Sequence, residues 1–254
     1  LDTPAGTVEL LRAMREAGYD VEDIPATGNA LIDRMREGPT NAARDGREIK
    51  IRISEADYEK YFSNLPPNLQ TEVTERWGGP DQDPFYVEES FALPAFYCGG
   101  TIIGLQPARG YNIDPSKTYH DPALVPPHGY LAFYAWLQSH ADAVIHMGKH
   151  GNLEWLPGKA LALSSSCYPE AALGPMPHIY PFIVNDPGEG TQAKRRSQAV
   201  IIDHLTPPLT RAETYGPLSD LERLVDEYYE ASGVDPRRLA VLRDQIVALS
   251  GQIG

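Results

Sequence analysis

The sequence predicts an α/β fold with short, mostly parallel strands, flanking helices, long functional loops and a helical C-terminal tail. Short apolar runs typical of buried strands alternate along the chain with segments of helical periodicity. The 254 residues include 22 glycines and 23 prolines, which predicts many loops between short elements. Hydrophobic residues make up 42% of the chain, enough for a packed core.

Residues 1–90 form the first predicted domain, a partial α/β unit with a helical segment. Apolar residues recur at helical spacing over 7–17, Gly18 ends this helix, and residues 19–21 have the composition of a short strand. With the helix that follows, this strand predicts half of an α/β layer. The later helices predicted in this domain cover residues 29–37, 54–62 and 67–77.

Residues 91–212 form the second predicted domain, an α/β core. Gly99-Gly100 separates two β-prone runs and predicts a hairpin over 95–97 and 101–105. The following stretch, 106–127, is irregular and of a length typical of functional loops. The remaining elements expected here are a buried helix over 129–138, strands over 142–147, 179–184 and 199–202, and a helix from about Thr191.

Residues 213–254 form the third predicted domain, two helices over 218–231 and 236–249. The chain starts at Leu1 rather than at a methionine, which we interpret as a piece of a longer protein.

Charge and composition exclude several functions. Lys and Arg number 22 against 35 Asp and Glu, a net charge of −13, which argues against a nucleic-acid-binding protein. The longest apolar run, residues 130–137, is too short to span a membrane. Two cysteines do not make a disulfide framework, so we expect a reducing, cytoplasmic location.

The strongest candidate for chemistry follows the predicted strand over 142–147. His146, His150 and Glu154 are spaced four residues apart, and imidazole and carboxylate groups bind divalent transition metals or accept protons near neutral pH. Because Gly148 and Gly151 disfavour a continuous helix, we expect a tight loop and then one helical turn near 152–156. The alternative is a loop of structural polar residues.

A second candidate is residues 185–196, which follow a strand and open a helix. Its three cations, Lys194, Arg195 and Arg196, suit a ligand that bears carboxylates or phosphates. A solvated basic helix turn is the alternative. The spacing Gly188-x-Gly190-x-x-Ala193 also matches a dinucleotide fingerprint, but the segment has a proline before the glycines and lacks the later acidic residue.

A third candidate is the loop that begins at residue 106. Arg109, Tyr111 and Asn112 offer hydrogen bonds and an aromatic face, suited to a lid or wall for a flat ligand, or to a plain ordered loop. The chain has no G-x-x-x-x-G-K-[ST] phosphate loop. We therefore do not expect it to hydrolyse a nucleotide itself.

Three segments of the sequence resemble the large chelatase subunits, a family that comprises the cobaltochelatase CobN subunit and the magnesium-chelatase H subunit. They are the loop motif (residues 106–112), the histidine motif (146–159) and the basic motif (179–196). The resemblance extends over most of the chain. Residues 119–128 and 152–157 are more similar to the cobalt branch than to the magnesium branch.

The resemblance implies a subunit that binds a tetrapyrrole and houses metal insertion, while separate AAA+ ATPase subunits hydrolyse ATP. For the cobalt branch, the implied reaction is ATP-dependent insertion of Co²⁺ into hydrogenobyrinic acid a,c-diamide, on the route to cobalamin. Mg²⁺ insertion into protoporphyrin IX is the alternative within the family. Two further alternatives are a non-catalytic module that carries the tetrapyrrole or docks the ATPase subunits, and a nicotinamide-dependent oxidoreductase.

Combined with this reaction, the residues receive hypothetical roles. His146, His150 and Glu154 are the expected catalytic residues, and the same three with Glu189 are the expected metal ligands. We expect Glu154 and Lys194 to face a common cleft. The residues predicted to bind the substrate are Arg109, Tyr111, Asn112, Lys149, Lys194, Arg195 and Arg196.

Overall fold

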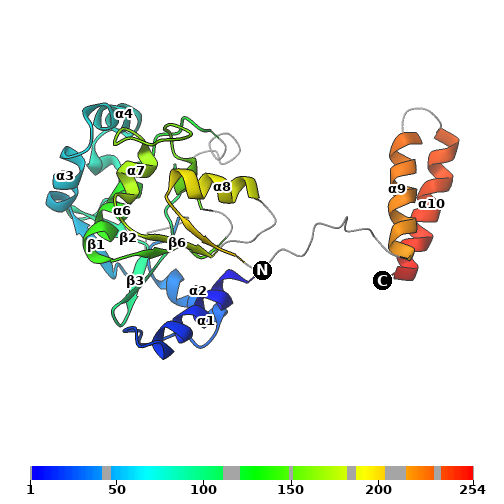
Figure 1. Ribbon diagram of the computed structural model, residues 1–254, viewed down its shortest axis with the longest axis horizontal. Coiled ribbons are helices and arrows are strands. Elements are labelled where there is room, and N and C mark those ends of the chain that lie inside the picture. Colours follow the sequence, from blue (N-terminus) through cyan, green and yellow to red (C-terminus); the bar gives the residue numbers. More distant parts are fainter. Residues whose placement is uncertain are drawn as a thin grey trace. The chain divides into compact units, whose positions relative to one another are not determined.

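The computed structural model describes residues 2–41, 47–110, 121–148, 151–181, 187–203, 216–231 and 236–253 (Figure 1). The chain divides into two compact units, Leu1–His204 and Leu205–Gly254. The first unit contains the sheets and the described parts of all three motifs, and the second is a pair of helices. The domain limits at residues 90 and 212 stay predictions.

The first unit begins with two packed helices, α1 (Thr3–Glu16) and α2 (Gly28–Glu37). The strand predicted over 19–21 is wrong, and with it the half α/β layer. Gly18 adopts a φ of 93°, and the Tyr19 N–H donates to the Met14 carbonyl, so this stretch closes the end of α1. Val21 then packs into a core cluster with both helices and the hairpin described below.

An antiparallel pair that was not predicted follows, formed by β1 (Ile51–Ser54) and β2 (Ser90–Leu93). Residues 51–54 alternate over only four positions and lack the glycine pair that marks the predicted hairpin, so their pattern alone does not distinguish a strand from a loop. Between them lie the helices α3 (Glu55–Ser63) and α4 (Pro67–Trp77) and a 3-10 turn, η1 (Pro80–Gln82). The two α-helices confirm the predictions over 54–62 and 67–77.

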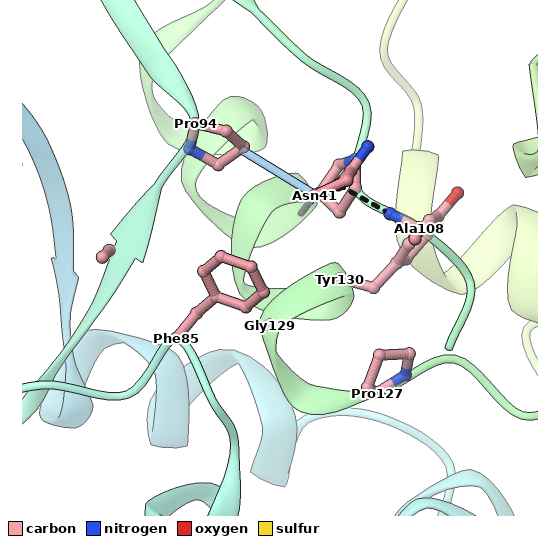
Figure 2. A pocket seen from close by; sticks show the side chains of 9 residues that line it. Asn41, Phe85, Pro94, Ala108, Pro127, Gly129 and Tyr130 are labelled. Atoms are coloured by element: carbon pink, nitrogen blue, oxygen red, sulfur yellow. Dashed lines mark hydrogen bonds between the residues drawn. The ribbon is translucent and has the colours of Figure 1, made fainter. Parts of the chain in front are cut away.

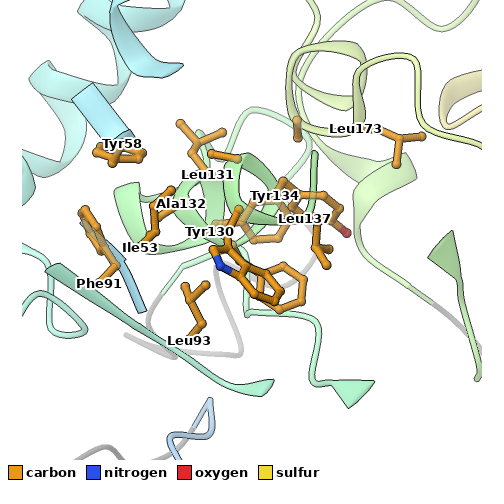
Figure 3. Close-up of a cluster of buried hydrophobic side chains, with 14 of the residues drawn as sticks. Ile53, Tyr58, Phe91, Leu93, Tyr130, Leu131, Ala132, Tyr134, Leu137 and Leu173 are labelled. Atoms are coloured by element: carbon orange, nitrogen blue, oxygen red, sulfur yellow. The ribbon is translucent and has the colours of Figure 1, made fainter. Parts of the chain in front are cut away.

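The hairpin predicted around Gly99-Gly100 is confirmed as β3 (Ala95–Cys98) and β4 (Thr101–Gly104), with Gly99 at a φ of 64°. The predicted buried helix is also confirmed, as α6 (His128–His140). All eight residues from Tyr130 to Leu137 are buried. α6 is the centre of the main core, and Figure 3 shows side chains from α3, β2 and the unpredicted helix α7 (Tyr168–Leu173) gathered around it.

The predicted parallel sheet is confirmed in the order β5-β6-β7, beside the two antiparallel pairs. β6 (His178–Pro181) lies between β5 (Val144–Ile145) and β7 (Val200–Ile202), and α8 (Pro187–Arg196) connects β6 to β7. β5 is shorter and less buried than predicted, because only two of its residues pair with β6. Directly after β5 comes the histidine motif.

The second unit consists of α9 (Pro217–Ala231) and α10 (Pro236–Ile253), which pack against each other. Both helices confirm the predictions, although α10 extends four residues beyond the predicted end. Leu242 and Ala231 are buried between them, while acidic side chains of α9 line a groove with Arg238 of α10. No helix in the described part of the chain is long and apolar enough to cross a membrane.

Candidate active site

Glu154 lies at the centre of the site. It is in η2 (Leu153–Trp155), a 3-10 turn in the position where the sequence predicts one helical turn after a loop. Its side chain is fully buried, with 0% exposure. A buried carboxyl group is uncommon and expensive to desolvate, so the surroundings of Glu154 decide what it does.

Two arginines from different motifs hold the turn that carries Glu154. Arg196, at the end of α8, donates to the main-chain carbonyls of Glu154 and Leu156, each at 2.7 Å, and to that of Lys159 at 3.1 Å. Arg109, from the loop motif, donates to the Trp155 carbonyl at 2.9 Å. Three successive carbonyls, 154 to 156, therefore accept from guanidinium groups, an arrangement we call the arginine clamp.

The clamp changes what Arg109 and Arg196 are expected to do. Arg196 is buried, with 9% exposure, and burial lowers its pKa. Its guanidinium is engaged with the histidine motif, so its predicted contact with substrate has no support in this geometry. Ala193, Arg196 and Ser197 are all buried, and Ala193 precedes the other two by three and four residues. This spacing is a sequence signal for an inward-facing arginine, whereas Lys194 and Arg195 are exposed.

A hydrogen-bond network ties the loop motif to the same turn. The Asn152 N–H donates to the side-chain oxygen of Gln106, and the Asn152 side chain donates to the Pro107 carbonyl, both at 2.9 Å. From α6, the Tyr130 hydroxyl donates to Asn152 Oδ1 at 2.8 Å. The Tyr134 hydroxyl accepts from Gln106 Nε2 at 2.8 Å. No role was predicted for these side chains, although tyrosines within an apolar helix are a signal for buried hydroxyls that need partners.

Three buried tyrosines are close enough to Glu154 for its charge to affect their pKa values. Burial raises the pKa of Tyr134 to about 12, and it also raises the pKa of Tyr130 and of Tyr180. In all three cases the negative charge of Glu154 acts in the same direction. The tyrosines therefore remain neutral phenols at physiological pH, and their hydroxyls contribute dipoles rather than charges around the carboxylate.

His146 lies directly after β5 and stacks on Tyr180 of β6, with ring centroids 4.4 Å apart. Its main-chain N–H donates to the Ile179 carbonyl at 2.8 Å, which continues the parallel pairing by one residue. The Gly151 N–H donates to the Tyr180 hydroxyl at 2.7 Å. Tyr180 thus links His146 to the start of the turn that carries Glu154. Nothing in the sequence patterns singles out Tyr180.

His178, which the sequence predicts to be structural, lies beside the same two rings, with its ring centroid 5.7 Å from that of Tyr180 and 5.9 Å from that of His146. Its ring Nδ1 lies 3.0 Å from the Ser197 carbonyl and donates to it, because a carbonyl only accepts. Glu189 is in the first turn of α8, and its negative charge also raises the pKa of Tyr180, after burial and Glu154. Glu189 therefore lies on the Tyr180 side of the site.

Several predicted site residues lie outside the described part of the chain: Tyr111, Asn112, Lys149 and His150. In the part that the structure describes, no group of three or more His, Cys, Asp or Glu side chains is placed to hold a metal ion. Two predicted ligands, His146 and Glu154, belong to segments joined through Tyr180. The basic and histidine motifs lie together, with α8 and η2 in direct contact through Arg196.

A small cavity lies beside the loop motif (Figure 2). Asn41 reaches across it and accepts a hydrogen bond from the Ala108 N–H at 3.0 Å, while its amide donates to the Gln106 carbonyl. The cavity has a volume of about 20 Å³, room for a single water molecule. It is therefore part of the support of the loop motif and is much too small for a macrocycle.

Comparison with known proteins identifies the family. The model of the CobN/Magnesium Chelatase family matches residues 1–254. The aerobic cobaltochelatase subunit CobN of a Sinorhizobium species is 66% identical, and that of Pseudomonas aeruginosa 56%, over 100% and 98% of this chain. The magnesium-chelatase H subunit of Chlorobaculum parvum is 33% identical over 91% of this chain and 18% of its own length.

A solved structure, titled the catalytic subunit of cobaltochelatase from Mycobacterium tuberculosis, matches with a TM-score of 0.72 and 47% identity. The match covers 98% of this chain and 22% of that one. The chain spans about one fifth of the length of the CobN relatives. It belongs to the CobN/magnesium chelatase family.

Proposed function

We propose that this chain carries the metal-insertion site of the large subunit of an ATP-dependent cobaltochelatase, which inserts Co²⁺ into hydrogenobyrinic acid a,c-diamide. The observation that carries the proposal is the arrangement around Glu154. Arginines of the loop motif and of the basic motif both donate hydrogen bonds to the turn of the histidine motif. Residues of all three motifs therefore fix the backbone of one buried carboxylate residue, Glu154.

The chemistry of insertion suits these groups. Protons must leave the ring nitrogens of the tetrapyrrole while a partly dehydrated divalent ion is handed over. A carboxylate and an imidazole form a weak ligand set from which such an ion can be transferred, and either accepts a proton. We assign the proton-accepting role to Glu154 and the transient metal contacts to His146, His150, Glu154 and Glu189.

The substrate has several carboxylate side chains, which need cations. Lys194 and Arg195 are exposed at the end of α8, and with Lys149, Tyr111 and Asn112 they are our candidates for binding it. Because Arg109 and Arg196 are occupied in the arginine clamp, we assign them to the support of Glu154. The surface that holds the macrocycle would be completed by parts of the subunit that this chain does not span.

ATP hydrolysis belongs, in this proposal, to partner AAA+ subunits in the cytoplasm. The acidic groove along α9, which includes Glu222, Asp226 and Glu230, is a candidate docking surface for them. A pull-down with the ATPase subunits, with and without residues 213–254, tests this assignment. Equal recovery of both forms would contradict it.

Sequence identity favours cobalt over magnesium. The cobaltochelatase relatives are 56% and 66% identical to this chain, against 33% for the magnesium-chelatase relative. Titration of the subunit with hydrogenobyrinic acid a,c-diamide and with protoporphyrin IX, followed by absorbance, separates the two reactions. Tighter binding of protoporphyrin would favour the magnesium alternative.

The decisive experiment is Glu154→Gln in the assembled complex with ATP. This change keeps the size of the side chain and removes its charge. We expect Co²⁺ insertion to fall at least about a hundredfold, the usual contribution of a positioned base, with tetrapyrrole binding retained. The control is Glu75→Gln, an exposed carboxyl of α4. An unchanged rate in Glu154→Gln would refute the proposal.

A further inference from the structure

Tyr180 contacts both ends of the segment that runs from His146 to Gly151. Its ring stacks on the imidazole at one end, and its hydroxyl accepts the Gly151 N–H at the other. The side chain is fully buried, with 0% exposure. The catalytic roles proposed above do not use Tyr180.

The pairing of β5 with β6 explains the stack. Val144 pairs with His178 and Ile145 with Ile179, so the next residue of the chain, His146, comes to lie beside Tyr180. Partners in a parallel ladder point to the same face of a sheet. The two rings therefore meet as a consequence of strand register, with an interplanar angle of 27°.

Gly151 lies against the Cε1 edge of the imidazole. A β-carbon at Gly151 would overlap the ring of His146, so the glycine backbone lies directly against it. The imidazole is thus contacted on its face by the Tyr180 ring and at its edge by Gly151. The hydrogen bond from Gly151 to the Tyr180 hydroxyl fixes these two neighbours of the imidazole relative to each other.

We propose that Tyr180 is a positioning residue for metal insertion, which holds the His146 imidazole by stacking on its face and fixes the start of the turn that carries Glu154. Its effect on insertion rests on the proposed function, but its anchoring role does not. As a neutral phenol, Tyr180 is a poor metal ligand and does not compete with His146 or Glu154 for the ion.

Hydrogen exchange of the whole 254-residue chain tests the anchoring. Tyr180→Phe keeps the stack and removes the hydroxyl that accepts from the Gly151 N–H. The matched control is Tyr61→Phe, which deletes a hydroxyl that donates to the Ala171 carbonyl at 2.9 Å, away from the site. We expect exchange of the Gly151 amide to rise about tenfold in Tyr180→Phe and to stay unchanged in Tyr61→Phe. Equal exchange in the two variants would overturn the proposal.

Insertion kinetics of the assembled complex test the catalytic consequence. We expect Tyr180→Phe to lower kcat about tenfold while KM for the tetrapyrrole stays within about twofold, because the geometry of His146 and Glu154 changes but the substrate contacts do not. Tyr180→Leu, which also removes the stack, should lower kcat further. A wild-type kcat in Tyr180→Phe would overturn the positioning role.

Failure of the Tyr180 role and failure of the proposed function give different results. If Glu154→Gln inserts Co²⁺ at the wild-type rate, the proposed function is wrong, and the exchange experiment still decides whether Tyr180 anchors Gly151. If Glu154→Gln is inactive and Tyr180→Phe behaves like Tyr61→Phe, only the inference about Tyr180 is wrong.

Discussion

The guanidinium of Arg196 donates to the main-chain carbonyl of Glu154 at 2.7 Å, across 42 positions of the sequence. Arg109 makes the same kind of contact with the neighbouring carbonyl of Trp155. Together the two arginines place the buried carboxylate by holding its backbone.

Arg196→Lys should destabilise the first unit. Lysine keeps the charge but lacks the planar fork that spans the carbonyls of Glu154 and Leu156. We expect the free energy of unfolding to fall by about 2 kcal/mol, the cost of losing hydrogen bonds to a charged buried donor. Urea denaturation measures the change. Arg195→Lys, at an exposed neighbouring position, should change it by less than about 0.5 kcal/mol, and equal effects of the two variants would count against the clamp.

Gly151→Ala should abolish most Co²⁺ insertion in the assembled complex. The added methyl group overlaps the His146 imidazole and must displace it, and a displacement of about 1 Å in a catalytic group can cost a hundredfold in rate. Insertion assays under saturating tetrapyrrole measure the loss. The control is Gly251→Ala in α10, where a β-carbon meets nothing within 4 Å and helix propensity predicts a gain of up to about 1 kcal/mol. A fully active Gly151→Ala variant would show that the imidazole is not confined.

Asn152→Asp should loosen the contact between the loop motif and the histidine motif. The substitution removes the amide that donates to Pro107 and adds a negative charge two residues from the buried Glu154. We expect about 2 kcal/mol of destabilisation, measured by thermal unfolding. Asn68→Asp, exposed on α4, should be nearly neutral. The prediction is wrong if the two variants unfold alike.

Stability should fall on mild acidification because of His128. Its Nε2 donates to the Gly78 carbonyl, so its neutral Nδ1 accepts from the Tyr58 hydroxyl. Burial lowers the pKa of His128 below its usual 6.5, so the unfolded chain takes up the proton first. The stabilisation is complete above pH 6.5 and is lost as the pH falls below it, at up to about 1.4 kcal/mol per pH unit.

Unfolding at a series of pH values between about 7.5 and 5, which brackets this window, measures the effect of His128. The variant His128→Gln should show a shallower dependence on pH. His178, whose pKa burial also lowers, contributes in the same direction, so His128→Gln should keep part of the slope. An unchanged slope in this variant would contradict the assignment.

Much of the fold could be predicted because its signals are local. Residues 129–138 are apolar on nearly every side, and only a helix of that length within the core buries the apolar run from Tyr130 to Leu137 completely. The convergence of the histidine and basic motifs follows from strands that end at one edge of a parallel sheet. Residues 19–21 and β1 lack such a signal, because neither has the glycine pair that marks the hairpin nor a continuous apolar run. A strand was therefore predicted over 19–21 where the structure has none, and the strand β1 was not predicted.

The detailed support of the site could not be predicted from local patterns. Three consecutive cations alone do not show which of them turns inward, and the spacing of Ala193 and Ser197 around Arg196 becomes decisive only once the face of α8 that meets η2 is known. The hydroxyls of Tyr130 and Tyr180 acquire their partners only through tertiary contacts. Residue type and spacing thus single out Glu154 as a candidate, whereas the groups that hold its backbone needed coordinates.

The arginine clamp has a consequence for redesign. Its acceptors at positions 154 to 156 are peptide oxygens, which every amino acid supplies, so the side chain at position 154 can be exchanged while these backbone contacts persist. Under the proposed function, a library at this single position would present different donor atoms to the ion from one unchanged location. Substitutions at Arg109 and Arg196 would instead keep the carboxylate of Glu154 and change its position. The identity of the side chain at position 154 and its position in the site can therefore be varied separately.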